Sequence, residues 1–133
     1  MRVPVLALLS LTAIHPAFAQ PSGDPSGTWL TESGAKVRVA RCGGGYCGTL
    51  ASTSGSGLDV NNPDPALKSR KLVGVQILTA TTPTGDGFGG SLYNPNDGKT
   101  YSGSLTPKGA VRLSVSGCVL RVLCKSQTWT RVK

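Results

Sequence analysis

"VRLSVS", residues 111–116, is the stretch that decides the fold. Its apolar residues fall on alternate positions, with polar residues between them. Successive side chains of a β-strand point to opposite faces, so this pattern predicts a strand that buries Val111, Leu113 and Val115. A strand with one buried face belongs to a sheet that covers a core.

Similar but looser patterns occur along the rest of the chain, at residues 27–31, 36–42, 46–51, 72–78, 87–93, 99–105 and 126–132. With 111–116 they predict about eight strands. Turn-forming residues stand between them, such as Pro107 and Gly109 in "TPKGA". Short strands joined in sequence favour an antiparallel meander, which loses its exposed edges by closing on itself. The sequence therefore predicts an all-β fold, a small up-and-down antiparallel β-barrel.

The chain begins with Arg2, an apolar run over residues 3–14 and the small-residue site Ala17-Phe18-Ala19. This order is typical of an export signal. We expect residues 1–19 to be a cleaved signal peptide, residues 20–26 a flexible leader and residues 27–133 a single β-barrel domain. The apolar run is too short for a transmembrane segment. The protein is expected to be exported, either to a periplasm or fully secreted.

Four cysteines follow the predicted signal: Cys42, Cys47, Cys118 and Cys124. An even number of cysteines in an exported chain indicates disulfides, and three pairings are possible. The short spacings favour Cys42 with Cys47 and Cys118 with Cys124, each across the end of a hairpin. A structural zinc site is the less favoured alternative, because the spacings do not match those of zinc knuckles.

The sole histidine, His15, lies in the predicted signal. Its removal excludes histidine-based triads and histidine metal sites from the mature chain, and we expect neither a metal nor a cofactor. Asp59 and Asp64 are left as a possible carboxylate pair of a histidine-free hydrolase. No activating partner is visible beside them, so this is the least favoured of three functions, and a non-catalytic protein is expected.

Positive charge dominates the chain. Without Arg2 the sequence has 13 basic and 6 acidic residues, a net charge of +7, and no acid follows Asp97. The basic residues beyond that point are Lys99, Lys108, Arg112, Arg121, Lys125, Arg131 and Lys133. Such a field suits an anionic envelope glycolipid or cell-wall polymer, or serves only to keep the protein soluble. A nucleic acid partner is not favoured, because no basic run is interleaved with aromatics.

The stretch "DVNNPDPALKSRK", residues 59–71, interrupts the strand patterns. Asn62 before Pro63 is typical of a helix start, since asparagine caps free amides and proline suits the first helical position. The sequence predicts a short helix over residues 63–70 with structural roles for Asn62 and Pro63.

This helix is expected to plug one mouth of the barrel through Ala66 and Leu67. Asp59 and Arg70 are expected to pair across its base. A cavity beneath the helix would be the observation most informative about function.

Five motifs then occur in order: "GTWLT", "VRVARCGGGYCGTL", "DVNNPDPALKSRKLVG", "GGSLYNPNDGKTYSGSL" and "SQTWTRV". From Gly27 to Val132 the chain resembles the exported bacterial family called domain of unknown function 2147. The resemblance implies a lipocalin-like (calycin-type) β-barrel without an established activity. The family pattern falls on Gly27, Trp29, Gly48, Asn62, Pro63, Leu67, Arg70, Gly74, Tyr93, Pro95, Gly98, Lys99, Tyr101, Trp129 and Arg131.

The chain departs from that pattern at Lys68 and Lys71, where an arginine and a proline are expected. Lys68 keeps the charge but loses a bidentate donor. The resemblance also implies that Arg131 covers Trp29 in a structural cation–π contact that shuts one end of the barrel. Arg121 is the substitute if Arg131 points outward.

These features favour a binding module for a small, partly apolar ligand. Tyr93, Tyr101 and Trp129 are the candidate cavity walls and Arg70 a candidate polar handle at the mouth. Plain core packing remains the alternative for each aromatic residue. A protein that binds an anionic envelope component through its basic C-terminal face is the second hypothesis, and its test is reversal of Arg112, Arg121 and Lys125.

Overall fold

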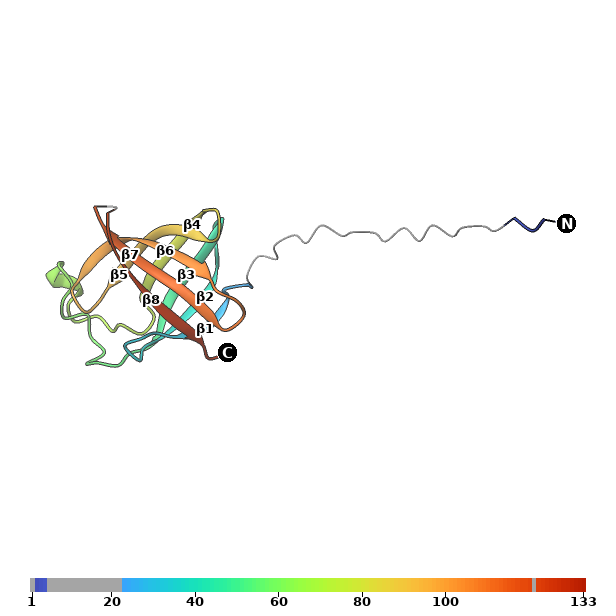
Figure 1. The fold of residues 1–133 in the computed structure, drawn as a ribbon. Helices are drawn as coiled ribbons and strands as arrows, with labels where there is room; N and C mark the ends of the chain where they lie inside the picture. Colours follow the sequence, from blue (N-terminus) through green and yellow to red (C-terminus); the bar gives the residue numbers. More distant parts are fainter. Residues whose placement is uncertain (1, 5–22, 121) are drawn as a thin grey trace.

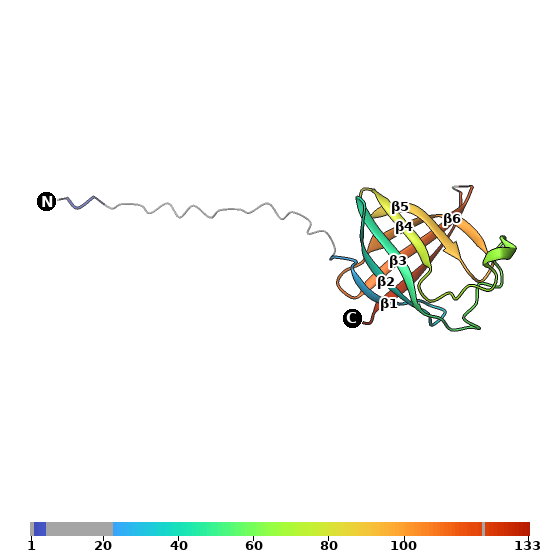
Figure 2. The same cartoon turned by 180° about the vertical axis from the view of Figure 1, so that it is seen from behind.

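The computed structural model of the chain, which describes residues 2–4, 23–120 and 122–133, is a closed antiparallel β-barrel (Figure 1 and Figure 2). The predicted signal peptide, residues 1–19, lies outside the described residues apart from residues 2–4. The strands are β1 (Gly27–Leu30), β2 (Lys36–Cys42), β3 (Gly45–Ser52), β4 (Gln76–Pro83), β5 (Phe88–Asn94), β6 (Lys99–Pro107), β7 (Arg112–Val119) and β8 (Leu123–Arg131).

Every strand pairs with the next one along the chain. The barrel closes where β1 pairs with β8, through Trp29 opposite Arg131 and Leu30 opposite Thr130. This arrangement confirms the predicted up-and-down barrel of eight strands.

The alternation in "VRLSVS" is seen in β7, where Leu113 and Val115 are buried. Val111 differs from the prediction, because β7 begins at Arg112 and the Val111 side chain is 62% exposed. The inward-facing residues of the other strands complete one core, with Val37, Val39, Leu78 and Leu105 almost fully buried.

Strand β4 runs over Gln76–Pro83 instead of the predicted 72–78. The apolar residues before it belong to a loop that is held by long-range bonds. The Leu72 amide donates to Gly57 O at 2.8 Å and the Gly74 amide to Leu50 O at 2.8 Å. Gly74 has φ +95°, a conformation that favours glycine and is not that of a strand, and β4 begins two residues after it.

The end of the barrel where β1 begins and β8 finishes is called the closed end. The Arg131 guanidinium lies 4.4 Å from the centroid of the Trp29 ring. It also donates at 2.6 Å to each of three backbone carbonyls, those of Asp24, Ser26 and Ala110. These contacts hold residues 24–26 against the barrel, although the sequence assigns them to a leader. Arg121, the alternative to Arg131, lies outside the described residues.

The opposite, open end carries the long connection between β3 and β4. The predicted helix over residues 63–70 is wrong, because the connection contains only a 3-10 turn at Pro65–Leu67. Its cap is Asp64, whose Oδ1 accepts a hydrogen bond from the Ala66 amide at 2.9 Å. The predicted cap, Asn62, is buried, and its side chain bonds to Asp59 and to the Asp64 amide.

No residue of the 3-10 turn is buried, so the turn does not plug the barrel. The predicted contacts are absent because Ala66 is exposed and Leu67 is only half-buried. The part of the chain that the structure describes holds no helix with the length and apolar character needed to span a bilayer.

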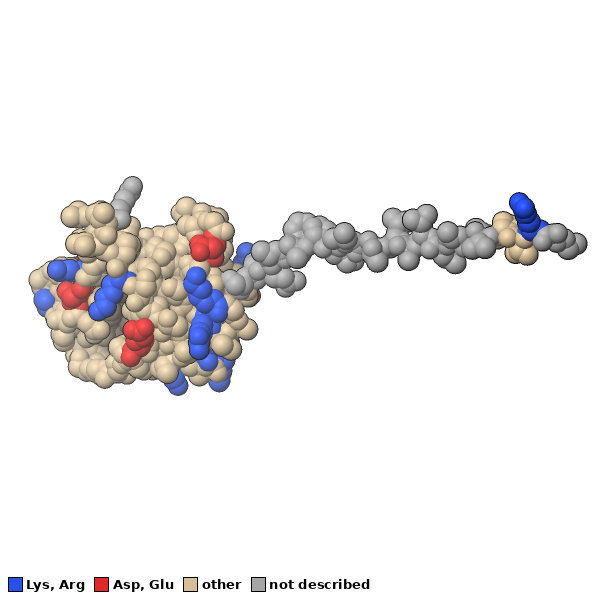
Figure 3. Space-filling model, viewed as in Figure 1, with Lys and Arg blue, Asp and Glu red and all other residues tan. Residues whose placement is uncertain are grey.

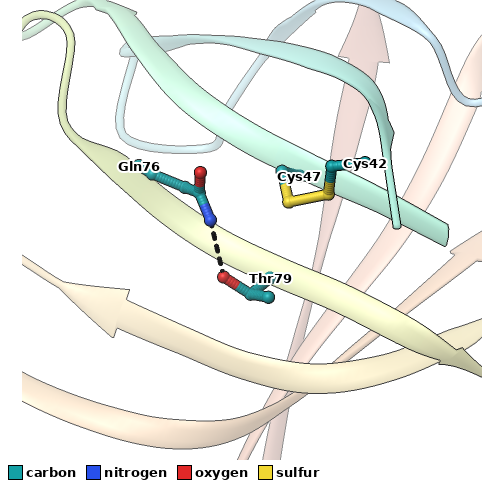
Figure 4. Close-up of a disulfide and its surroundings, with 4 residues drawn as sticks. All are labelled: Cys42, Cys47, Gln76 and Thr79. Carbon is teal, nitrogen blue, oxygen red and sulfur yellow. Dashed lines mark hydrogen bonds between the residues drawn. A yellow bond between two sulfur atoms is a disulfide. The ribbon is translucent and has the colours of Figure 1, made fainter. Parts of the chain in front are cut away.

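Both predicted disulfides are present. Cys118 and Cys124 lie directly opposite each other in the β7–β8 hairpin. Cys42 and Cys47 close the β2–β3 hairpin, beside Gln76 and Thr79 of β4 (Figure 4). Each disulfide therefore braces one hairpin, the first at the closed end and the second at the open end.

Candidate functional site

A cavity of about 830 Å³ occupies the open end of the barrel. We call it the interior cavity. Its walls come from strands β3 to β8 and from the loops at this end of the barrel. The polar and apolar lining residues include Thr31, Glu32, Ala35, Leu50, Leu72, Ile77, Leu92, Tyr93, Asp97, Tyr101, Gly117, Lys125, Gln127 and Trp129.

The floor of the interior cavity is formed by Trp129, whose side chain is 2% exposed. The indole Nε1 donates to Gln127 Oε1 at 2.7 Å, so the polar atom of the ring has a partner and the rest of the ring packs as an apolar surface. Leu50 and Ile77 are buried beside the cavity. The deep part of the cavity is therefore apolar.

The cover of the cavity comes from the first part of the β3–β4 connection. Residues between Thr53 and Asn61 line the cavity, whereas residues 63–70 do not. Asn61 fastens this segment to the β5–β6 turn, because its Nδ2 donates to Pro95 O and Asn96 O at 3.1 Å. The expected lid over residues 63–70 is therefore wrong, and we call residues 53–61, which line the cavity instead, the lid segment.

The tip of the β7–β8 hairpin forms one rim of the cavity. Figure 1 shows this tip and the 3-10 turn at the same end of the barrel. Three of its apolar side chains line the cavity although they are largely in contact with solvent: Val119 is 45% exposed, Val122 80% and Leu123 72%. These side chains form a cluster of exposed apolar residues at the rim of the cavity.

Beside the cavity, the carboxylate of Asp59 is fully buried. Its Oδ2 accepts hydrogen bonds from Asn62 Nδ2 and Arg70 Nε, both at 2.8 Å, and its Oδ1 accepts one from the Tyr93 hydroxyl at 2.5 Å. The expected pair of Asp59 with Arg70 is thus present as an ion pair. The network joins the β3–β4 connection to β5.

The network changes the ionisation of both of its central groups. Burial raises the pKa of Asp59, but hydrogen bonds from Tyr93, Asn62 and Arg70 outweigh it and leave that pKa below its ordinary value. Burial, followed by the bond to Asp59, raises the pKa of Tyr93 to about 12. At neutral pH Asp59 is therefore an ionised acceptor and Tyr93 a protonated donor.

This arrangement is unsuited to the hydrolase hypothesis. Asp59 is buried and surrounded by donors, and Asp64 caps the 3-10 turn, so the two carboxylates have separate structural tasks. Among the described residues, no group of three histidine, cysteine, aspartate or glutamate side chains could hold a metal ion.

The candidate ligand residues are divided between two places. Tyr93, Tyr101 and Trp129 line the interior cavity. Arg70 lies outside it and lines an outer pocket of about 550 Å³ with Asn62 and Pro63, and Tyr93 lines this pocket as well. Its Nε is occupied by Asp59, so its first task is to hold the lid segment.

Sequence reasoning missed the partners that Asp59 finds in Asn62 and Tyr93, and it missed Lys125 and Gln127 as cavity residues. Alternation through "CKSQTWT" was the available signal, because Lys125 and Gln127 share the parity of Trp129.

The basic C-terminal face is also divided. Arg112 lies opposite Thr130 and Lys125 opposite Gly117, so the two are separated along the hairpin by roughly 17 Å at about 3.4 Å per residue. Arg121 lies outside the described residues. The space-filling view shows basic side chains at several separate places with acidic ones among them (Figure 3).

Comparison with known proteins agrees with this architecture. Among solved structures, protein HP1028 from the human pathogen Helicobacter pylori, which belongs to the lipocalin family, is similar with a TM-score of 0.72 and 22% sequence identity. The match covers 83% of this chain and 84% of the Helicobacter protein. No curated protein matches. Residues 27–131 match the family described as uncharacterized protein conserved in bacteria, DUF2147. The chain therefore belongs to the DUF2147 family and has a lipocalin-like barrel.

Proposed function

We propose that this protein is a non-catalytic binding module that holds one small, partly apolar ligand in the interior cavity. The observation that carries the proposal is the cavity itself, whose volume of about 830 Å³ lies within the usual range of roughly 300 to 1,000 Å³ for ligand pockets. An eight-stranded barrel accommodates one small ligand at most.

The chemistry of the walls supports an apolar portion of the ligand. The Tyr93 hydroxyl is bonded to Asp59 and the Tyr101 hydroxyl to Asp97, so the polar atoms of both rings have partners. Arg70 lies over the Tyr93 ring, 6.0 Å from its centroid, and the rings of Tyr93, Tyr101 and Trp129 offer apolar surface where they line the cavity. Preformed aromatic walls require little rearrangement when a ligand enters.

The proposed place of action is outside the cytoplasm. Two disulfides favour an oxidising compartment, because cytosolic thiols are kept reduced. The predicted signal peptide would deliver the protein to a periplasm or to the medium.

The proposal is tested with N-phenyl-1-naphthylamine, a neutral apolar dye that fluoresces in dry pockets, and with native mass spectrometry of protein purified from its own envelope. We expect saturable binding of one dye molecule. The chain has two tryptophans, Trp29 at the closed end and Trp129 in the cavity. Energy transfer to the dye should persist in Trp29→Phe and weaken sharply in Trp129→Phe.

A matched pair of substitutions supplies the control. Ala35 lines the cavity, while Ala40 is exposed on β2. Ala35→Phe should reduce dye binding, and Ala40→Phe should leave it unchanged, with folding of both checked by circular dichroism. Equal dye binding by both folded variants would contradict the cavity as the site.

Binding of an anionic envelope polymer through a basic face draws less support, because Arg112 and Lys125 lie far apart on the β7–β8 hairpin. It would require salt-sensitive binding that disappears when Arg112, Arg121 and Lys125 are reversed together.

A further inference from the structure

We infer that the ligand is an anionic amphiphile whose apolar tail lies on Trp129 and whose negatively charged head group binds Lys125 at the mouth of the interior cavity. This inference rests on the proposed function and adds the chemical class of the ligand and a residue that selects it.

The inner face of β8 sets the order of the contacts. Leu123, Lys125, Gln127 and Trp129 occupy alternate positions and all four line the interior cavity. Trp129 is buried, Gln127 is half-buried, and Lys125 and Leu123 are exposed, so the wall runs from a closed apolar floor to an open charged mouth. From Trp129 to Lys125 it extends about 14 Å at roughly 3.4 Å per residue, enough for an extended apolar chain.

Lys125 lies at the open mouth of the cavity, and its side chain is exposed. The residue directly opposite on β7 is Gly117, against which the side chains of Tyr101 and Leu92 pack. A carboxylate, sulfate or phosphate group would therefore meet the ammonium group from the solvent side of the mouth, with its apolar chain in the cavity.

Among the described residues, the charged ones that line the interior cavity are Glu32, Asp97 and Lys125. The two acids already accept hydrogen bonds from other residues of the barrel. Glu32 Oε1 accepts from the Thr128 amide at 2.9 Å, beyond the end of the β1–β8 pairing. Asp97 accepts from the Lys99 amide at 2.9 Å and from the Tyr101 hydroxyl.

Lys125 differs from these acids because its side chain makes no hydrogen bond or ion pair with any described residue. An unpaired cation above an apolar cavity is complementary to an anion attached to an apolar chain. Its counterpart at the closed end, Arg131, is fully engaged with three carbonyls and an indole ring.

The exposed rim fits the same ligand. Val119, Val122 and Leu123 are in contact with solvent in the empty protein, yet they line the interior cavity. An amphiphile that fills the cavity would cover them, and the Cys118–Cys124 disulfide holds the hairpin in place for this contact. The rim thus needs no second macromolecule to remove its apolar surface from water.

The experiment measures displacement of bound N-phenyl-1-naphthylamine by dodecanoic acid and by dodecan-1-ol, which share a tail and differ in charge, at concentrations below micelle formation. Wild type, Lys125→Gln and Lys125→Glu are compared. Lys108→Gln is the control, since Lys108 is an exposed lysine in the β6–β7 turn at the closed end.

We expect Lys125→Gln to weaken binding of the acid roughly tenfold, near the low end for a hydrogen bond from a charged group because Lys125 is exposed, and to leave binding of the alcohol unchanged. Lys125→Glu should weaken the acid further, and Lys108→Gln should match wild type. Because Lys125 is exposed, these variants should fold as wild type does, with circular dichroism as the check.

The failures of the two proposals are distinguishable. If the dye binds but acid and alcohol respond identically in all four proteins, Lys125 does not select the ligand, while the cavity remains a binding site. If neither dye nor amphiphile binds any variant, the proposed function itself fails. Self-association that Leu123→Ser abolishes, with acid binding unchanged, would show that a second copy covers the rim and would overturn this assignment of the rim.

Discussion

The hydroxyl group of Tyr93 donates a 2.5 Å hydrogen bond to Oδ1 of Asp59, and the two residues are 34 positions apart in the sequence. This bond ties the β3–β4 connection to β5 next to the interior cavity. Because the connection supplies the cavity's lid, the stability of this network decides whether the site is preformed.

Tyr93→Phe is the first prediction. The change leaves a buried carboxylate without one of its donors, which should lower the free energy of unfolding by about 1 to 3 kcal/mol in urea titrations. Tyr101→Phe is the control, because the Tyr101 hydroxyl bonds to the exposed Asp97, and its loss should cost less. Equal losses of unfolding free energy in the two variants would mean that burial of Asp59 does not raise the cost of removing its hydrogen-bond donor.

The same pair predicts how stability depends on pH at the alkaline end. The pKa of Tyr93 is about 12 in the folded protein, above its ordinary value near 10, so the fold favours the protonated hydroxyl. Its contribution is complete below about pH 10 and is lost as pH rises toward 12. Absorbance titration of tyrosinate should show a late step that is missing in Tyr93→Phe.

At the acid end, which we call the acid limb, stability depends on pH with the opposite sign. The pKa of Asp59 is lowered in the fold, so its contribution is present above the unfolded value near 4 and disappears as pH falls through the lower folded value. Asp59→Asn should be destabilised at neutral pH and should lose less stability than wild type on acidification. An unchanged acid limb would show that Asp59 does not contribute to it.

Gly98 carries another prediction. A Cβ at this position would lie 1.8 Å from the Asn61 carbonyl oxygen, at φ +70°. Gly98→Ala should therefore push the lid segment away and weaken dye binding as well as stability. Gly109 is the control, because it has φ +87° but no atom within 4 Å of its Cβ, so Gly109→Ala has only the backbone strain. The difference between the variants measures the contact between lid and turn.

The strands and disulfides could be predicted because their signals are local. Alternation in "VRLSVS" and the cysteine spacings need only the geometry of one hairpin, and both were correct apart from the exposed Val111. The start of β4 could not be predicted, since the apolar residues from Leu72 are held in a loop by backbone bonds to distant residues.

The helix prediction failed for a related reason. Asn62 before Pro63 is a valid local signal for a helix start. The Asn62 side chain instead donates a hydrogen bond to Asp59, a buried carboxylate that needs donors. The candidate walls Tyr93, Tyr101 and Trp129 do line the interior cavity, whereas the lid segment becomes visible only when the strands are placed side by side. The parity that Lys125 shares with Trp129 indicates its face of the strand but not its place at the mouth. Local pattern thus predicts elements, and long-range hydrogen bonds decide the loops that shape the site.

The closed end gives a further prediction. Arg131→Lys keeps the charge above Trp29 but loses the planar fork that reaches the carbonyls of Asp24, Ser26 and Ala110. The free energy of unfolding should fall by about 2 kcal/mol, since hydrogen bonds from charged groups contribute roughly 1.5 to 3 kcal/mol each. Arg112→Lys is the control on the neighbouring strand, because the Arg112 side chain is exposed and has no hydrogen bond to a described residue. Equal stability of the two variants would show that the clamp is not needed.

The two disulfides give the last prediction, because they brace opposite ends of the barrel with similar sequence separations of 5 and 6 residues. Loops this short imply a similar stabilisation of about 2 kcal/mol for each bond, so replacing either pair by serine should lower the free energy of unfolding by a comparable amount.

The affinity for the dye, in contrast, should differ between the two disulfide-free proteins. Cys124 lines the interior cavity, and its bond to Cys118 holds the apolar rim, whereas Cys42 and Cys47 lie at the closed end. The Cys118→Ser/Cys124→Ser protein should bind the naphthylamine dye several-fold more weakly than the Cys42→Ser/Cys47→Ser protein, because a loosened hairpin must be ordered when the ligand binds. Equal affinities in the two folded proteins would show that the rim does not contact the ligand.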